Sequence, residues 1–453
     1  MGGNFISRGF DIMSESISAN RETLSGISFG AVWQYVLIYL SLLMPGSTFV
    51  YIKGGTWFSF LLVALFAITF LLARKYRESY GVCFSLVLVL NTLVARSLTG
   101  GVGLEALMGF MGCVLIVQMA ICCDFVHFLK RWLLTVVALA LLSILLWGVG
   151  CVFPSVLKSL LGPTFVVDVI GTYPWETYEY GSGLFFYSWF DIHQFRNCGI
   201  YTEPGKYQVV LNSALFILLF WREKIELRSE RHYRFYLSVI VVALITCQST
   251  TGYIGALLCV AFYVLFSKDH ESTRTRQWLV ALVCAAVVTL LVQYWLAPTN
   301  SILSVQVFDK LFGSSVGGAG LDLSNSTGVY RSKMIEVCIR SIAEHPLGVG
   351  YDALFSAAAS SGEGLVAAAL VSYGAVYGVV PWTVVLFMVF YPVFKGQRFP
   401  VALLYVALFV NTTLAQTHFL YTSLLIIPAY LAIGHGWPLR NEKEKYLPWK
   451  KFW

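Results

Sequence analysis

The stretch Lys130-Arg-Trp-Leu-Leu-Thr-Val-Val-Ala-Leu-Ala-Leu-Leu-Ser-Ile-Leu-Leu-Trp-Gly-Val-Gly-Cys-Val-Phe153 decides the fold. Two cations are followed by residues 132–153, which contain no charged side chain. A helix needs about 20 apolar residues to cross the hydrocarbon core of a bilayer, and Lys and Arg collect on its cytoplasmic flank. This stretch therefore predicts a membrane-spanning helix that starts at the cytoplasmic face.

Similar apolar segments recur on both sides of this one. Hydrophobic residues make up 58% of the 453 residues and charged residues only 12%, about half the charged share of a soluble domain. The pattern predicts an all-α polytopic membrane protein with about 12 transmembrane helices. The predicted segments are 30–49, 55–73, 80–97, 104–123, 132–153, 206–221, 233–248, 252–267, 278–297, 365–394, 399–414 and 418–435.

The distribution of charge predicts the orientation. If the N-terminus lies inside, most of the 31 Lys and Arg fall in the connections on the cytoplasmic side, as the positive-inside rule requires. We therefore expect an inner-membrane protein with both termini in the cytoplasm and membrane lipid as its solvent. The net charge of +7 is explained by this topology, and we expect no nucleic-acid partner.

The predicted spans divide the chain into six parts. Residues 1–153 hold the N-terminal segment and helices one to five, 206–297 hold helices six to nine, and 365–435 hold helices ten to twelve. The long segment 365–394 is expected to kink at Pro381 or to begin above the membrane. A basic cytoplasmic tail covers 436–453. Two long periplasmic loops, 154–205 and 298–364, remain, and connections of this length usually carry function.

The first long loop ends in Arg196-Asn-Cys-Gly-Ile-Tyr-Thr-Glu-Pro-Gly-Lys206. Pro204 suits the first turn of the next helix, which places Glu203 just before it. Glu203 is then either a reactive carboxylate or an ordinary helix cap, and Arg196 is either a ligand for an anion or a solvated loop charge. The aromatic stretch 173–180 in the same loop either stacks on sugar rings or forms an interfacial aromatic belt.

The second long loop is expected to contain an amphipathic helix over 328–344. Arg331 falls in its first turn, where a cation opposes the helix dipole, so an anionic ligand explains it better than helix stability does. A guanidinium matches phosphate oxygens in a bidentate fork, which makes Arg331 the first candidate for a pyrophosphate contact. Lys333 and Arg340 are weaker candidates.

The end of this helix leads into Pro346-Leu-Gly-Val-Gly350, for which we expect a tight turn rather than a phosphate loop. His345 is either an acid or base near neutral pH or simply the residue that ends the helix. No motif for a metal-held sugar nucleotide, for ATP or for a zinc ion is present, so we expect neither a metal nor a cofactor. For Cys198 and Cys338, both in the long loops, free thiols are favoured over a disulfide.

The two loop motifs resemble those of the O-antigen polymerase and ligase superfamily. Residues 196–205 resemble its arginine-glycine-glutamate-proline segment, and Gly328-Val-Tyr-Arg331 followed by 345–350 resembles its second-loop segment. The resemblance implies a GT-C-like glycosyltransferase whose donor and acceptor are glycans linked to undecaprenyl pyrophosphate, with a chain-length regulator as a further partner. Tyr201 and Tyr330 fall inside these motifs and become candidates for substrate binding.

The resemblance also implies roles for individual residues. Arg196 and Arg331 would hold the donor pyrophosphate, and Glu203 would orient or deprotonate the acceptor hydroxyl. Ligases of the superfamily place a histidine before the tenth helix, where this chain has Ser360-Ser-Gly-Glu363. The Wzy-type polymerase is therefore favoured over the ligase, and Glu363 is either a substitute base or a helix cap.

A transporter remains the alternative from another class. A flippase for the same lipid-linked unit would be expected to carry charges along a central cavity and to have mostly short loops. Here the charges outside the cytoplasmic connections lie mostly in the two long loops, which favours the enzyme.

Overall fold

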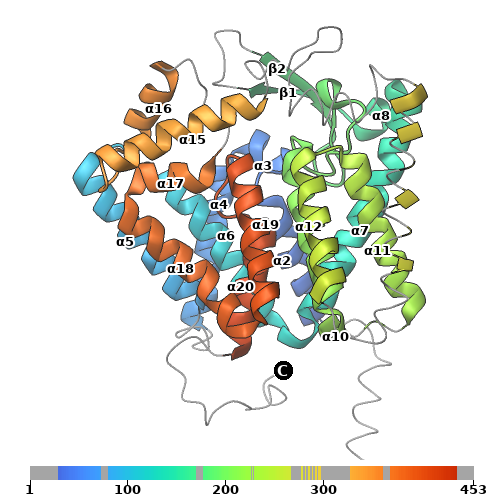
Figure 1. Cartoon of the computed structure of the whole chain (residues 1–453), viewed down its shortest axis with the longest axis horizontal. Helices are drawn as coiled ribbons and strands as arrows, with labels where there is room; N and C mark the ends of the chain where they lie inside the picture. The colour runs from blue at the N-terminus through green and yellow to red at the C-terminus, as the bar shows by residue number, and fades with distance from the viewer. Residues whose placement is uncertain are drawn as a thin grey trace, which may run out of the picture.

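The computed structural model describes residues 29–72, 80–169, 177–225, 227, 229–266, 327–360 and 368–435, with single helical positions between 277 and 296. These residues form a helical bundle with a small sheet at one end (Figure 1). The first group of helices comprises α2 (Phe29–Leu43), α3 (Thr48–Lys53), α4 (Gly55–Leu72), α5 (Tyr80–Thr99), α6 (Leu104–Cys123) and α7 (Phe125–Val152). Within it, α2, α4 and α5 all pack against α6.

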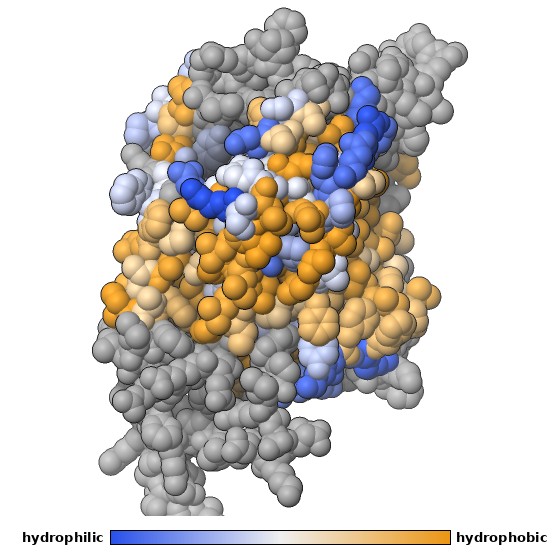
Figure 2. All heavy atoms as spheres, turned by 90° about the vertical axis from the view of Figure 1, so that its left-hand side faces the viewer, coloured by the Kyte–Doolittle hydropathy of each residue, from blue (hydrophilic) through white to orange (hydrophobic). Residues whose placement is uncertain are grey.

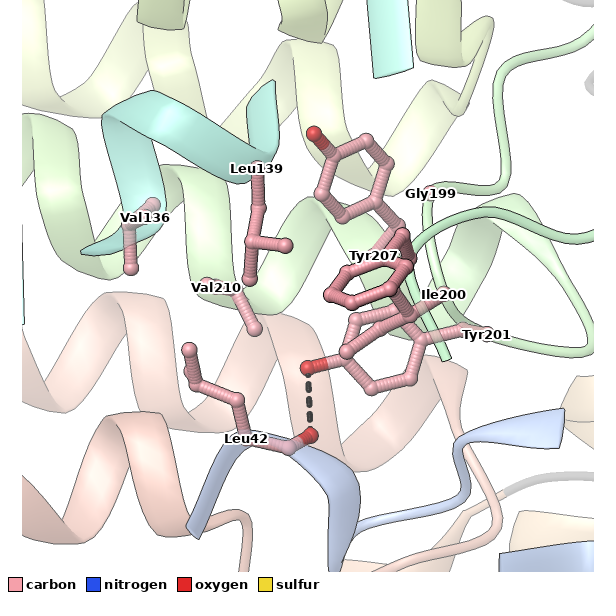
Figure 3. A pocket seen from close by; sticks show the side chains of 9 residues that line it. Leu42, Val136, Leu139, Gly199, Ile200, Tyr201, Tyr207 and Val210 are labelled. Atoms are coloured by element: carbon pink, nitrogen blue, oxygen red, sulfur yellow. Dashed lines mark hydrogen bonds between the residues drawn. The ribbon is translucent and has the colours of Figure 1, made fainter. Parts of the chain in front are cut away.

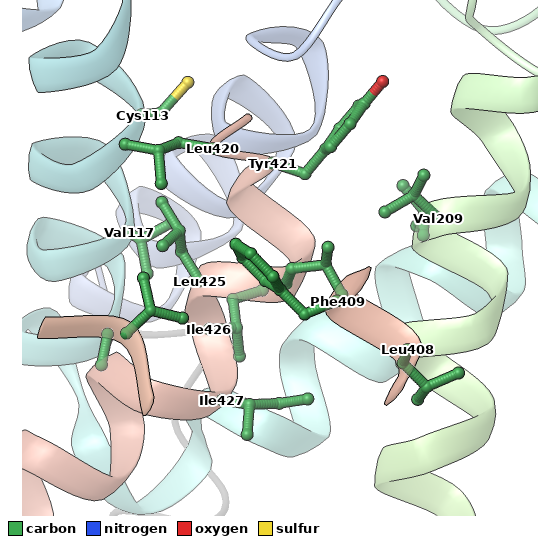
Figure 4. Packing of buried hydrophobic residues seen from close by; sticks show 14 of the residues in the cluster. Cys113, Val117, Val209, Leu408, Phe409, Leu420, Tyr421, Leu425, Ile426 and Ile427 are labelled. Carbon is green, nitrogen blue, oxygen red and sulfur yellow. The ribbon is translucent and has the colours of Figure 1, made fainter. Parts of the chain in front are cut away.

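The second group is arranged around α9 (Pro204–Phe220), which contacts α7 and most of its own group. The other members are α10 (Arg222–Ile225), α11 (Glu230–Cys247), α12 (Thr250–Phe266), α19 (Phe399–Ala415) and α20 (Thr422–His435). Almost every residue of α9 is buried, because the helix is surrounded by α7 and the other members of its group. Figure 4 shows the aliphatic packing where α6, α19 and α20 meet beside α9.

A hydrophobic surface surrounds the bundle. The helices α5, α6, α7 and α18 (Val379–Gly396) are long and apolar enough to cross a membrane, and several shorter apolar helices of 10–17 residues accompany them. On α5, the exposed Leu86, Leu90 and Leu93 follow one helical face, and Figure 2 shows a hydrophobic zone across this side of the molecule. The chain is a largely helical, membrane-embedded protein, whereas the count of about twelve spans and the cellular orientation stay predictions.

The first long loop departs from the all-α prediction. After α8 (Pro154–Leu161) it forms a 3-stranded antiparallel sheet of β1 (Thr164–Val169), β2 (Thr177–Ser182) and β3 (Trp189–Phe190). In the register, Thr164 pairs with Ser182, and Ser182 pairs with Trp189. Strands form here because Phe-Val-Val-Asp-Val is rich in aromatic and β-branched residues. The aromatic stretch 173–180 lies largely outside the described residues, and its two interpretations stay open.

The predicted kink at Pro381 is wrong. The helix breaks at Gly378 instead, between α17 (Ala369–Tyr377) and α18, and Pro381 lies in the first turn of α18, where proline is tolerated. The turn 346–350 docks into the break: Gly350 donates its N–H to Val376 O (3.2 Å), and Val379 donates to Pro346 O (2.9 Å). Irregular backbone inside a membrane protein needs such partners.

The helix predicted over 328–344 is present as α15 (Thr327–Glu344), followed by α16 (Tyr351–Ser360), which was not predicted; the place of α15 in a periplasmic loop stays a prediction. The turn at 346–350 is also confirmed, with Gly348 and Gly350 at positive φ. Both α15 and α16 lie at the same end of the bundle as the sheet (Figure 1). Cys198 and Cys338 are buried and are not joined by a disulfide, as favoured above.

Candidate functional site

Glu203 stands at the N-cap position of α9, directly before Pro204, as the sequence predicted. Its backbone is extended, but its side chain makes no capping hydrogen bond. The carboxylate instead lies 3.5 Å from Lys206 Nζ, and the Glu203 side chain is 41% exposed. A carboxylate at an N-cap position normally accepts a hydrogen bond from the first turn of the helix. Because the Glu203 carboxylate does not, it is available to interact with a substrate.

Lys206 lies one turn further along and is buried, with 7% of its surface exposed. Its Nζ donates to Thr202 Oγ1 (2.9 Å) and lies 5.9 Å from the centre of the half-exposed Tyr51 ring. Burying an ammonium group is costly unless it is paired, and a cation in the first turn of a helix is repelled by the helix dipole. The N-terminal end of α9 around Glu203 and Lys206, called the head of α9 below, therefore favours an anion.

Two side chains from the segment before α20 complete this cluster. The Cβ atom that Gly46 lacks would lie 2.9 Å from Lys206 Cδ and 3.1 Å from His418 Nε2. Gly46 has φ +101°, a conformation that favours glycine. Because Gly46 has no side chain, Lys206 and His418 both pack against its backbone. The rings of His418 and Tyr421 meet edge to face, with 5.6 Å between their centres.

Both of these rings are electrically neutral at physiological pH. Burial, and next the charge of Lys206, lower the pKa of His418 to about 3. Burial raises the pKa of Tyr421 well above its usual value, and the nearby Glu203 carboxylate adds to the effect. The Tyr421 hydroxyl is buried and has no hydrogen-bond partner in the described part of the chain, and Figure 4 shows it pointing away from Ile426 and Ile427. The cluster thus offers one cation, one carboxylate and two neutral polar groups.

Sequence reasoning missed His418 and Tyr421 because the segment 418–435 was predicted to be one continuous membrane helix. The helix begins only at Thr422, and residues 416–421 form a connection between α19 and α20. The signal in the sequence was Gln416-Thr-His418, a polar interruption between two apolar runs.

Arg196 makes no hydrogen bond or ion pair to the Lys206 cluster among the described contacts. Its Nη2 donates to Gln248 O (3.1 Å) at the turn between α11 and α12, and its buried Nε has no partner among the residues that the structure describes. Gln248 in turn donates to Phe195 O (2.7 Å). Arg196 is therefore packed into the structure and is not a freely solvated loop charge.

Tyr201 is already engaged within the protein. Its hydroxyl donates to Leu42 O (2.8 Å), and its ring lines a small apolar pocket with Tyr207 and Val210 (Figure 3). The backbone of Tyr201 also bridges to Ser47, just before α3. These contacts tie the first loop to the start of α3 and give Tyr201 a structural task.

Four of the predicted site residues lie on α15. Tyr330 and Arg331 lie in its first turns, but their side chains are outside the described residues, so a clamp by two arginines stays a prediction. Lys333 is exposed. Arg340 is exposed and pairs with Glu336 one turn away (2.8 Å), which is an ordinary surface ion pair.

The last two candidates lie beyond this helix. His345 follows the end of α15 and is exposed; its N–H donates to Ser341 O (2.8 Å), as expected of a residue that ends a helix. Glu363 lies outside the described residues. Of the predicted residues, the structure therefore brings together Glu203 and Lys206, and it adds His418, Tyr421 and Gly46 to them.

Comparison of the chain with protein-family models, with curated proteins and with solved structures gave no match.

Proposed function

We propose that this protein polymerises oligosaccharide repeat units linked to undecaprenyl pyrophosphate into O-antigen or a related surface polysaccharide. The reaction is a metal-independent glycosyl transfer at the periplasmic face. The observation that carries the proposal is Glu203, a carboxylate at a helix N-cap position that does not cap and that lies beside a buried lysine. The resemblance of residues 196–205 and 328–350 to the polymerase family supplies the substrate class.

The chemistry requires one base and one anion holder. Glu203 accepts the proton of an acceptor hydroxyl as its oxygen attacks the anomeric carbon of the donor sugar. The bond from that carbon to the pyrophosphate breaks, and the pyrophosphate leaves with the electron pair on its carrier lipid. The developing negative charge is stabilised by cations already in place, for which Arg196 and Arg331 are the candidates from the resemblance.

A deletion strain distinguishes the proposal from its alternatives. Loss of a polymerase leaves lipopolysaccharide whose core carries a single repeat unit. Loss of a ligase leaves bare core with polymer retained on the carrier lipid, and loss of a flippase leaves repeat units on the cytoplasmic side. Either of the last two results would contradict the proposal.

A second test addresses the metal-free mechanism. The purified protein should polymerise synthetic lipid-linked repeat units at an unchanged rate in EDTA. Loss of activity that Mg²⁺ restores would contradict a mechanism driven by side chains alone.

A further inference from the structure

We infer that the head of α9 is a binding site for a diphosphate group, built by Lys206, His418 and Tyr421 around Gly46. The choice of a lipid-linked diphosphate as its natural occupant rests on the proposed function. The site is separate from the two arginines that the sequence nominates, and it combines three stretches of chain, around residues 46, 206 and 418.

The charges at this point do not balance. Lys206 contributes one positive charge, and the helix N-terminus adds the equivalent of about half a charge, against the single carboxylate of Glu203. The separation of 3.5 Å between Lys206 Nζ and Glu203 Oε1 is longer than a tight charge-assisted hydrogen bond of about 2.8 Å. The site thus keeps a net positive potential in a buried place, which an additional anion would neutralise.

Tyr421 gives independent evidence that a ligand belongs here. The residue is 1% exposed, and its hydroxyl finds no hydrogen-bond partner among the described residues, although buried polar groups nearly always have one. Its hydroxyl lies within electrostatic reach of Glu203, and its ring contacts His418. A phosphate oxygen bound to Lys206 would accept the hydrogen bond that this hydroxyl cannot make otherwise.

His418 adds a neutral donor, and Gly46 adds space. An uncharged imidazole carries one N–H that can be donated to an anion. Its Nε2 approaches the bare Cα of Gly46, where any side chain would displace both His418 and the stem of Lys206. The open side of the site is formed by Glu203 and Tyr51, which are 41% and 48% exposed, so the ligand enters past the carboxylate.

This arrangement couples diphosphate binding to the base. An arriving diphosphate competes with Glu203 for Lys206, because both are anions that need the same ammonium group. When the diphosphate takes Lys206, the Glu203 carboxylate loses its partner and becomes free to accept the proton of the acceptor hydroxyl. Lys206 is then the residue that exchanges one anion for the other.

The test measures binding and needs no polymerisation. The full-length protein in nanodiscs is titrated with farnesyl diphosphate and, separately, with inorganic diphosphate, using isothermal calorimetry. Lys206→Met should weaken binding about tenfold or more, and Tyr421→Phe several-fold, as expected for hydrogen bonds to a charged group. Glu203→Gln should tighten binding, because the competing anion is gone.

Lys158→Met is the matched control, since Lys158 pairs with Asp191 (2.6 Å) on the exposed surface of the first loop. It should bind like the wild type. If inorganic diphosphate shows the same dependence on Lys206, the headgroup suffices; if only farnesyl diphosphate binds with that dependence, the ligand is the lipid. Both results support the site.

The inference is overturned if Lys206→Met binds like the wild type, or if Glu203→Gln weakens binding. Should Lys206→Met fail to fold, Tyr421→Phe and Glu203→Gln still decide, because their expected effects have opposite signs. A protein that polymerises but binds diphosphate independently of Lys206 refutes this site alone. A protein that binds through Lys206 but polymerises nothing refutes the proposed function alone.

Discussion

Acidification should destabilise this protein through His418. The pKa of His418 is lowered from 6.5 to about 3 in the folded chain, first by burial and then by Lys206. The folded state therefore keeps the imidazole neutral at a pH where the unfolded chain binds a proton. The contribution of His418 to stability is fully present above pH 6.5 and is lost as the pH falls toward 3.

The size of the effect follows from linkage. Each pH unit below the unfolded pKa removes about 1.4 kcal/mol from the free energy of unfolding. Between pH 6.5 and pH 5 the loss therefore approaches about 2 kcal/mol, as an upper value. Among the described residues, Lys206 and Tyr421 are the titratable groups that face His418.

The assay compares the thermal unfolding of detergent-purified wild type and His418→Gln from pH 7.5 to pH 5. The variant lacks the titrating group, so its stability should fall less steeply, by about one proton. His345→Gln is the control, because His345 is exposed at the end of α15, and its curve should follow the wild type. Parallel curves for the wild type and His418→Gln would refute the assignment of a buried, neutral His418.

Two further predictions concern the helix break and the surface. Gly378→Ala should destabilise the fold by about 1–3 kcal/mol, because Gly378 has φ +95° and an added Cβ would lie 2.7 Å from the Leu347 carbonyl carbon. The control is Gly109→Ala, which has open space around the added Cβ and should be neutral or stabilising. Equal melting temperatures for the two variants would show that the helix break does not need glycine. Arg340→Ala should change the free energy of unfolding by no more than about 0.5 kcal/mol and leave polymer length unaltered. Shortened chains on a polysaccharide gel would show that Arg340 takes part in substrate binding.

Helix positions were largely predictable because hydropathy is a local property. The predicted segment 104–123 coincides with α6 (Leu104–Cys123), and 80–97 lies within α5 (Tyr80–Thr99). The amphipathic helix predicted over 328–344 differs from α15 (Thr327–Glu344) by one residue. In each case a run of side chains with one period specifies the element without help from distant residues.

Features that depend on distant partners were not predictable. The break at Gly378 is satisfied by hydrogen bonds to the turn at 346–350, which no local pattern reveals. The strands of the first loop are short and need each other as hydrogen-bond partners, so the β-branched residues of β1 did not by themselves reveal the sheet. Pattern reasoning offered Pro381, the conspicuous helix breaker, as one possible site of the interruption, although proline is harmless in the first turn of a helix.

In the candidate site, too, contacts between residues close in the sequence were predictable and contacts between distant residues were not. Glu203 and Lys206 are three residues apart at a helix start, so their association follows from the sequence. The contact of Lys206 with His418 and Gly46 joins segments that are far apart in the chain, and only the folded structure reveals it. The orphan hydroxyl of Tyr421 likewise depends on what surrounds it.

The most direct test of the central claim is the polymerisation rate of purified Glu203→Gln on synthetic lipid-linked repeat units. Removing a general base should lower turnover by about 10²–10⁴-fold, while membrane insertion stays at the wild-type level. Glu336→Gln, which changes an exposed carboxylate paired with Arg340, should retain full activity. Polymer made by Glu203→Gln at the wild-type rate would contradict the account.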